Sequence, residues 1–322
     1  MASVAVLEIV TPENWCEDGY LLANPDLATA AANGLDIHTH FQEYGLQERR
    51  LQFSRAFLND RPHRDRLKYE RFKTVLSEAR GAAGEFRFVH EDGAFPVHYG
   101  GNAYSFEDYE RESANLGLGE FVREVEAHPH KDYLDIGCGL RNIIHDNCLY
   151  LEVYPSRTAD IIMEPACQYP IRSNSLDGIS CLAVLEHVEK PWLVAAEIRR
   201  MLAPGGLAFI DWPFLQPVHG YPNHYYNSTR YGLGQMFSEG FEHITLETYP
   251  NQTPEYVLSW LLRGWSAALT SDDVRREFGK MTVDQMIKEP PGGKFWKRLA
   301  QASPDDAKMT FAAGNTLIAR KI

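Results

Sequence analysis

The sequence predicts an α/β protein whose larger part is a parallel sheet covered by helices. From about residue 120 onward, strand-like apolar runs alternate with helical segments, and the first of these runs ends in an acid and two glycines. The chain has 322 residues and exceeds the roughly 250 to 300 at which one core stops growing, so a second, smaller lobe is expected. With 44% hydrophobic and 24% charged residues, the composition is that of a folded globular protein.

The predicted strands of the larger part follow the alternating pattern and cover residues 133–137, 149–154, 159–163, 178–184, 207–213, 243–249 and 315–321. The clearest helix runs from Pro191 to Leu202 and ends before Pro204-Gly205-Gly206, a helix stop. Further helices are expected over 255–300, and their large aromatic residues are expected in a core; the alternative is that they shape the acceptor pocket or an oligomer contact.

The first 119 residues predict a smaller, mixed segment. Two short helices are expected over 15–50, because Asn24-Pro25 suits a cap followed by proline and two glycines suit helix ends. Residues 51–75 predict a solvated amphipathic helix, and alternating aromatics around Asp92-Gly93 predict a hairpin that forms a small cap. The expected division is therefore a helical module at 1–55, an amphipathic helix and hairpin cap at 56–119, and the α/β domain at 120–322.

Charge and cysteine usage exclude several classes of function. Acidic residues outnumber basic ones by 44 to 32, and a net charge of −12 repels nucleic acid and anionic membrane surfaces. No run approaches 18 uncharged apolar residues, and the first ten residues lack a basic start, so neither a membrane span nor a signal peptide is predicted. Five cysteines without a CxxC pair predict reduced thiols and a cytoplasmic location.

The strand Tyr133-Leu134-Asp135-Ile136 runs directly into Gly137-Cys138-Gly139. Glycines at the carboxyl end of a strand let backbone amides approach a ligand, although the same pattern also forms simple tight turns. A nicotinamide dehydrogenase is disfavoured, because Asn142 stands where the GxGxxG pattern needs its third glycine.

The ordered series of motifs adds a more specific indication. Ser175-Leu176-Asp177-Gly178, Leu185-Glu186-His187-Val188 and Pro204-Gly205-Gly206 follow the glycine turn in order. This series resembles the class I S-adenosylmethionine-dependent methyltransferases of the methyltransferase type 11 kind, which have a Rossmann-like sheet. The resemblance implies an enzyme of that activity with S-adenosylmethionine as cofactor.

The resemblance also implies cofactor-binding residues. Asp135 and the amides of Gly137, Cys138 and Gly139 would serve the amino-acid end, and Glu152 would hold the ribose hydroxyls. Glu164 stands where the family usually has an aspartate that contacts the adenine, although here the sequence is Glu164-Pro165-Ala166. The remaining implied contacts are the wall beside the sulfonium and the loop after the fourth strand, at Leu182, Ala183 and His187.

A departure from the family's layout concerns the first crossover. Only the short segment from Leu140 to Cys148 separates the glycine loop from the second strand, whereas a parallel crossover with its helix normally needs about a dozen residues. We therefore expect the first helix to be a single turn or absent, with the N-terminal lobe or a partner subunit of a homo-oligomer covering the site. The alternative is a catalytically silent binding or scaffold protein whose site has decayed.

The segment 213–230 follows the fifth strand, where methyltransferases bind the methyl acceptor, and it is rich in aromatic residues and proline. Its histidines His219 and His224 are the candidate general bases, since imidazole titrates near pH 6.5, with a slight preference for His219. Alternatively, these side chains pack the following helix, and their spacing does not indicate a metal site. The candidate substrate contacts are Phe214, Tyr221, Tyr225 and Tyr226.

The N-terminal module has a second resemblance. Asn24-Pro25-Asp26-Leu27, His40-Phe41, Tyr44-Gly45 and Glu48-x-Arg50 resemble a helical module of bacterial surface-associated and polysaccharide-related proteins. By association, this favours a sugar or other small hydroxyl acceptor, and a docking role for the module.

Overall fold

A computed structural model describes residues 3–76, 86–89, 94–101, 103, 105, 117–165, 168–220, 223–313, 316 and 320. The chain forms two compact units, Met1–Asp211 and Trp212–Ile322. Among the helices in these described ranges, none combines the length and the apolar character that a membrane crossing requires.

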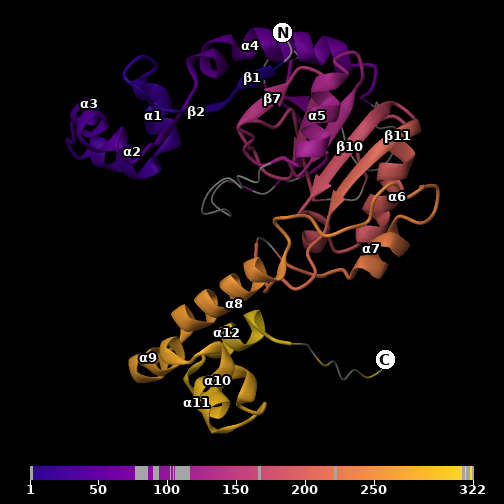
Figure 1. The fold of residues 1–322 in the computed structure, drawn as a ribbon. Helices are drawn as coiled ribbons and strands as arrows, with labels where there is room; N and C mark the ends of the chain where they lie inside the picture. The colour runs from indigo at the N-terminus through magenta and orange to yellow at the C-terminus, as the bar shows by residue number, and fades with distance from the viewer. Residues whose placement is uncertain are drawn as a thin grey trace. The chain divides into compact units, whose positions relative to one another are not determined.

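The first unit is built on a sheet to which the described residues contribute seven strands, in the order β11-β10-β6-β8-β9-β5-β4 (Figure 1). All neighbours pair in parallel except β4 and β5, which pair antiparallel. The strands are β4 (Phe86–Phe88), β5 (Val97–Tyr99), β6 (Tyr133–Ile136), β8 (Cys148–Glu152), β9 (Ile161–Met163), β10 (Leu176–Leu182) and β11 (Leu202–Asp211). The predicted Rossmann-like α/β fold is confirmed.

Between β10 and β11 the chain forms α6 (Pro191–Met201), which begins with Pro191 in its first turn and ends at the expected stop. Val194, Ile198 and Met201 of this helix are buried, as its apolar spacing predicts. A further helix, α5 (Gly119–Ala127), precedes β6 and packs Phe121 and Val125 into the core of the unit.

The crossover from β6 to β8 contains no helix, which confirms the expectation from its length. Residues 137–147 instead form a loop and a short strand, β7 (Ile143–His145). This strand pairs antiparallel with β1 (Ser3–Ala5) at the start of the chain, and Val6 donates its amide to the Asn142 carbonyl over 2.7 Å. The N-terminal arm is therefore hydrogen-bonded to the segment that follows the glycine loop.

A long helix, α4 (Arg55–Phe72), packs against the sheet of the first unit. Its Phe57 shares one core cluster with Phe53, Tyr133 and Tyr150, and Lys68 donates to Asp160 over 2.6 Å. The expectation of a solvated helix was wrong. Three charged residues, Arg64, Asp65 and Lys68, are buried: Lys68 pairs with Asp160, and Nη2 of Arg64 lies 3.6 Å from Oδ1 of Asp65.

The N-terminal module precedes this helix and has its own small core of Val10, Tyr20, Leu27, Ile37 and Phe41. Its elements are β2 (Leu7–Ile9), α1 (Glu17–Ala23), α2 (Pro25–Ala32), α3 (Ile37–His40), η1 (Phe41–Gly45) and β3 (Leu51–Phe53). Asn24 donates to the Tyr20 and Leu51 carbonyls, and Pro25 opens α2 as predicted.

The predicted hairpin is present as β4 and β5, but it differs from the expected cap. Val97 pairs with Ile161 of β9, so the hairpin extends the edge of the sheet and does not cover it. Its expected Asp92-Gly93 turn lies outside the described residues. The domain limits at residues 55 and 119 stay a prediction.

The second unit is helical in its described residues. Its helices are α7 (Arg230–Met236), α8 (Pro254–Ala268), α9 (Asp272–Lys280), α10 (Val283–Lys288), α11 (Lys294–Ala302) and α12 (Asp305–Thr310). Leu269, Phe278, Phe295 and Leu299 form its core. The predicted strand at 243–249 was wrong: these residues are irregular, with Ile244 exposed, and no described strand offers them a partner. The predicted strand at 315–321 lies largely outside the described residues.

Candidate functional site

The glycine loop after β6 takes the conformation that its glycines permit. Gly137 has a φ of +67° and Gly139 a φ of +57°, both in the left-handed region. A Cβ atom at Gly137 would lie 2.2 Å from Cγ2 of Val184, just beyond β10. The backbone of this loop therefore approaches the end of β10 more closely than any other residue type allows.

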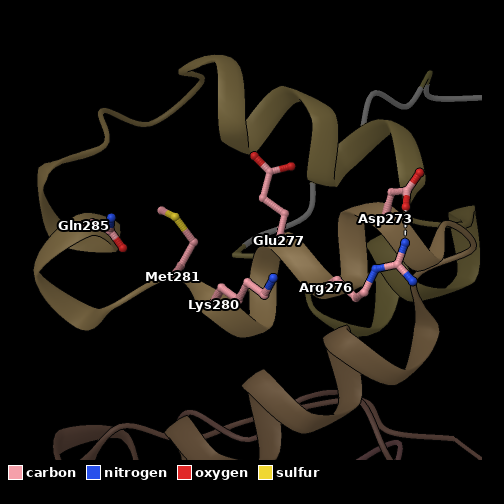
Figure 2. A pocket seen from close by; sticks show the side chains of 6 residues that line it. All are labelled: Asp273, Arg276, Glu277, Lys280, Met281 and Gln285. Atoms are coloured by element: carbon pink, nitrogen blue, oxygen red, sulfur yellow. Dashed lines mark hydrogen bonds and ion pairs between the residues drawn. The ribbon is translucent and has the colours of Figure 1, made fainter.

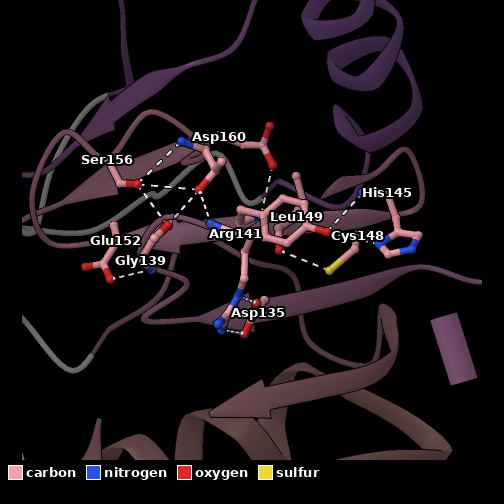
Figure 3. Close-up of polar contacts among 11 residues, drawn as sticks. Asp135, Gly139, Arg141, His145, Cys148, Leu149, Glu152, Ser156 and Asp160 are labelled. Atoms are coloured by element: carbon pink, nitrogen blue, oxygen red, sulfur yellow. Dashed lines mark hydrogen bonds and ion pairs between the residues drawn. The ribbon is translucent and has the colours of Figure 1, made fainter. Parts of the chain in front are cut away.

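Glu152 ends β8 beside this loop, and its side chain is buried. Its Oε1 accepts the amide of Gly139 at 2.9 Å (Figure 3). Its Oε2 accepts the amide of Val153 at 2.8 Å. Burial raises the pKa of Glu152 to about 7, although the two amides act to lower it. A carboxylate has about four acceptor positions, so capacity remains for further donors such as hydroxyls.

Asp135, in β6, is buried and paired with a residue that the sequence did not single out. Its two oxygens accept Nε and Nη2 of Arg141, at 2.7 and 3.0 Å (Figure 3). Asp135 thus holds the loop through Arg141. A single arginine in a loop carries no periodic or motif signal, which is why it was missed.

Two hydroxyls hold the loop from its other side. The carbonyl of Gly139 accepts Oγ of Ser156 at 2.8 Å and Oγ1 of Thr158 at 2.6 Å (Figure 3). Both residues are buried between β8 and β9, and sequence reasoning missed them too. Asp135, Gly137, Gly139 and Glu152 are therefore brought together, at the carboxyl ends of neighbouring parallel strands. Cys138, between the glycines, is fully buried.

The other predicted cofactor residues of the first unit have separate surroundings. Glu164 accepts the amide of Gly101 at 2.9 Å, so the structure places it against the segment after β5. Leu182 is buried at the end of β10, and Ala183 follows with a φ of +52°. Its amide donates to the Asp211 carbonyl.

His187 lies in a short 3-10 helix, η3 (Leu185–His187), that follows β10. Its Nε2 lies 3.8 Å from Oε1 of Glu186, whose side chain is fully buried. Burial raises the pKa of Glu186 to about 8, with a further increase from Asp211. Glu186 belongs to the motif Leu185-Glu186-His187-Val188, but nothing in the sequence indicated that its carboxyl group would be buried.

The two candidate bases of the second unit lie in contact with each other. The ring centroids of His219 and His224 are 4.6 Å apart, and the amide of His219 donates to Nδ1 of His224 at 3.3 Å. Nδ1 of His219 lies 2.8 Å from the Pro217 carbonyl, and Nε2 of His224 lies 2.7 Å from Oδ1 of Asn227. The ring of Trp260, from α8, packs against His219 at 4.9 Å.

The predicted substrate contacts Phe214, Tyr225 and Tyr226 are exposed. Tyr225 accepts a hydrogen bond from Asn223, and the Tyr226 carbonyl accepts Nε1 of Trp212. Tyr221 lies outside the described residues. Trp260 of α8 is exposed to a similar degree as Tyr225 and Tyr226.

A surface hollow of about 400 Å³ lies between α9 and α10 (Figure 2). Its ion pair, Arg276 with Asp273, is 69% and 82% exposed. Exposed charges of this kind bind ligands weakly, and we assign no role to the hollow. Its lining residues are Asp273, Arg276, Glu277, Lys280, Met281 and Gln285.

Comparison with known proteins places the glycine loop and Glu152 inside a recognised domain. Residues 134–210 match the family model described as a methyltransferase domain. No curated protein matches the chain. A solved structure of Haemonchus contortus phosphoethanolamine N-methyltransferase 2, with phosphomonomethylethanolamine and S-adenosylhomocysteine, is 16% identical with a TM-score of 0.30. That match covers 54% of this chain and 46% of the other, less than half of its length.

The methyltransferase domain supports S-adenosylmethionine as the cofactor, as predicted from the sequence. The residues present fit this molecule. Glu152 offers acceptor positions to hydroxyl donors, and the glycine loop admits no Cβ at Gly137, so its backbone is held close to the strand ends.

Proposed function

We propose that this chain is an S-adenosylmethionine-dependent methyltransferase that methylates a hydroxyl of a sugar or another small molecule. The observation that carries the proposal is the meeting of Glu152 and the glycine loop at the carboxyl ends of β6 and β8, inside the range that matches a methyltransferase domain. Ligands of open parallel sheets bind at this edge. When bound, the cofactor supplies an electrophilic methyl group on a sulfonium.

The cofactor part of the proposal assigns a task to each group of the loop. Glu152 accepts the ribose hydroxyls with the acceptor positions that Gly139 and Val153 leave. The glycine loop lies beside the amino-acid end of the cofactor and shapes that side of the site; within the protein its amides donate to the Leu151 carbonyl, from Gly137 and Cys138, and to Glu152, from Gly139. Leu182 and Ala183 exclude water beside the sulfonium, where charge is lost during transfer.

The base is His219, and its hydrogen bond to Pro217 supports this choice. A carbonyl oxygen only accepts, so Nδ1 of His219 carries the proton and Nε2 is the basic nitrogen of the neutral ring. This tautomer can accept the proton of a hydroxyl as the methyl group arrives. The aromatic residues Tyr225 and Tyr226 would contact the acceptor.

His224 serves His219 as a positioning residue. Its Nδ1 accepts the His219 amide, so its Nε2 carries the proton and donates to Asn227. Asn227 in turn donates to the Gln216 carbonyl at 2.9 Å. Both ring nitrogens of His224 thus hold the loop around His219. In this proposal His219 is the base and His224 positions it, whereas the sequence left the two histidines with nearly equal claims to the role of base.

The test uses purified protein, labelled S-adenosylmethionine and a panel of monosaccharides and small phenols as acceptors. His219→Ala should keep S-adenosylhomocysteine affinity and lose turnover by roughly 10²- to 10⁴-fold, the usual worth of a positioned base. His243→Ala is the matched control, because His243 lies outside the segment 213–230 and its Nε2 is 2.8 Å from the Phe237 carbonyl. Normal turnover in His219→Ala would contradict the assignment, and absence of cofactor binding in the wild type would favour a silent scaffold protein.

A further inference from the structure

The glycine loop lacks the helix that usually supports a nucleotide-binding turn. In a βαβ unit, the helix after the turn fixes the loop and directs the positive end of its dipole to the ligand. Here residues 140–147 contain the strand β7 and no helix. The loop is therefore held by other groups, of which Ser156 and Thr158 bind the Gly139 carbonyl.

Arg141 has the geometry for this task. Its guanidinium and the carboxylate of Asp135 form a two-pronged pair, with 2.7 Å between Nε and Oδ2 and 3.0 Å between Nη2 and Oδ1. Both side chains are buried, with 6% and 4% exposed. Asp135 lies two residues before Gly137 and Arg141 lies two residues after Gly139, so the ion pair joins the two ends of the glycine loop (Figure 3).

The backbone of Arg141 is tied to the same supports as Gly139. The Arg141 amide donates to Oγ1 of Thr158 at 3.3 Å, and this hydroxyl also donates to the Gly139 carbonyl. With the carbonyl of Gly139 fixed in this way, its amide is directed to Glu152. A displacement of Arg141 would therefore move the glycine loop, whereas Glu152 keeps its second hydrogen bond, from the Val153 amide.

Arg141 also balances the buried acids around the loop. Burial alone would lower the pKa of this guanidinium, but the Asp135 carboxylate raises it, so the group stays charged. Its charge favours the ionised form of Glu152, whereas Asp135 disfavours that form. Without Arg141, two carboxylates would share one buried region.

We propose that Arg141 is a positioning residue that replaces the missing crossover helix and holds the glycine loop for the amino-acid end of the cofactor. The proposal rests on the proposed function. It predicts that Arg141 matters for ligands that carry the amino-acid end and much less for ligands that lack it. S-adenosylhomocysteine and 5′-methylthioadenosine provide this pair, since they share the adenosine and the sulfur.

The experiment measures the affinity of the full chain for both ligands by calorimetry, in the wild type, Arg141→Met and Arg141→Lys. Arg141→Met should weaken the binding of S-adenosylhomocysteine by about 10- to 100-fold, a loss equivalent to one charge-assisted hydrogen bond. The affinity for 5′-methylthioadenosine should change by less than about threefold. Arg141→Lys keeps the charge and loses the fork, so it should restore part of the affinity.

Arg71→Met is the control. Arg71 pairs with Asp132 at the opposite end of β6, over 2.8 Å, and should affect neither ligand. An equal loss for both ligands would show a merely structural role, and unchanged affinities would show no role; either result overturns the inference. If Arg141→Met does not fold, Arg141→Lys is used instead: its loss of affinity for S-adenosylhomocysteine should exceed its loss of affinity for 5′-methylthioadenosine. Failure of the wild type to bind S-adenosylhomocysteine would instead refute the proposed function.

Discussion

Replacing Gly137 by alanine tests the close approach of the glycine loop to the end of β10. Two costs follow from the structure. The φ of +67° is left-handed, which costs a residue with a Cβ about 1–2 kcal/mol. The new Cβ would also lie 2.2 Å from Cγ2 of Val184, and relieving such overpacking typically costs about 1–3 kcal/mol.

The expected destabilisation of Gly137→Ala is therefore about 2–5 kcal/mol, measured by urea unfolding followed by circular dichroism. Gly205→Ala is the matched control, because Gly205 has a φ of +83° but nothing within 4 Å of an added Cβ. It should show the backbone cost alone, about 1–2 kcal/mol.

A double-mutant cycle separates the two costs. Adding Val184→Ala to Gly137→Ala removes the methyl group that the new Cβ meets, so the pair should show a favourable coupling of about 1–3 kcal/mol. The reasoning is refuted if Gly137→Ala costs no more than Gly205→Ala and the cycle shows no coupling.

Two further predictions concern buried charge. Lys68→Met should destabilise the protein by about 3–5 kcal/mol in urea unfolding, because it leaves Asp160 buried without its ammonium partner 2.6 Å away. Lys73→Met, which breaks an exposed pair with Glu70, should leave stability unchanged, and equal effects would contradict this account. Burial raises the pKa of Glu152 from 4.5 to about 7, so this side chain stays protonated in the folded state at pH values at which it is ionised in the unfolded chain. The stabilisation from the protonated Glu152 side chain is fully present below pH 4.5 and is lost as the pH rises to about 7. Over this range the free energy of unfolding of the wild type should therefore fall by on the order of 3 kcal/mol relative to that of Glu152→Gln. Parallel pH curves for the two proteins would show that Glu152 is not the group responsible.

The sequence allowed the sheet to be predicted where its signal was local. The strand at Tyr133–Ile136 and the helix at Pro191–Met201 follow directly from apolar runs and stop signals. The short crossover also allowed the missing helix to be predicted, because chain length limits what a parallel connection can contain.

The rest depends on contacts between distant segments. Lys68 looks like a solvated residue until Asp160, far along the chain, is placed against it. The segment at 243–249 alternates like a strand, but a strand forms only where a partner edge is available. Arg141, Ser156 and Thr158 support the site through hydrogen bonds to other segments, which leave no pattern in the sequence.

The central claim is that the glycine loop and Glu152 bind the cofactor. Calorimetric titration of S-adenosylhomocysteine into the wild type, Glu152→Ala and Glu126→Ala tests it most directly. Glu126 belongs to the same unit but is 52% exposed and pairs with His145, so its variant is the control. We predict saturable binding to the wild type and to Glu126→Ala, with a loss of at least about tenfold in Glu152→Ala. Absence of binding to the wild type, or equal affinity in Glu152→Ala, would contradict the claim.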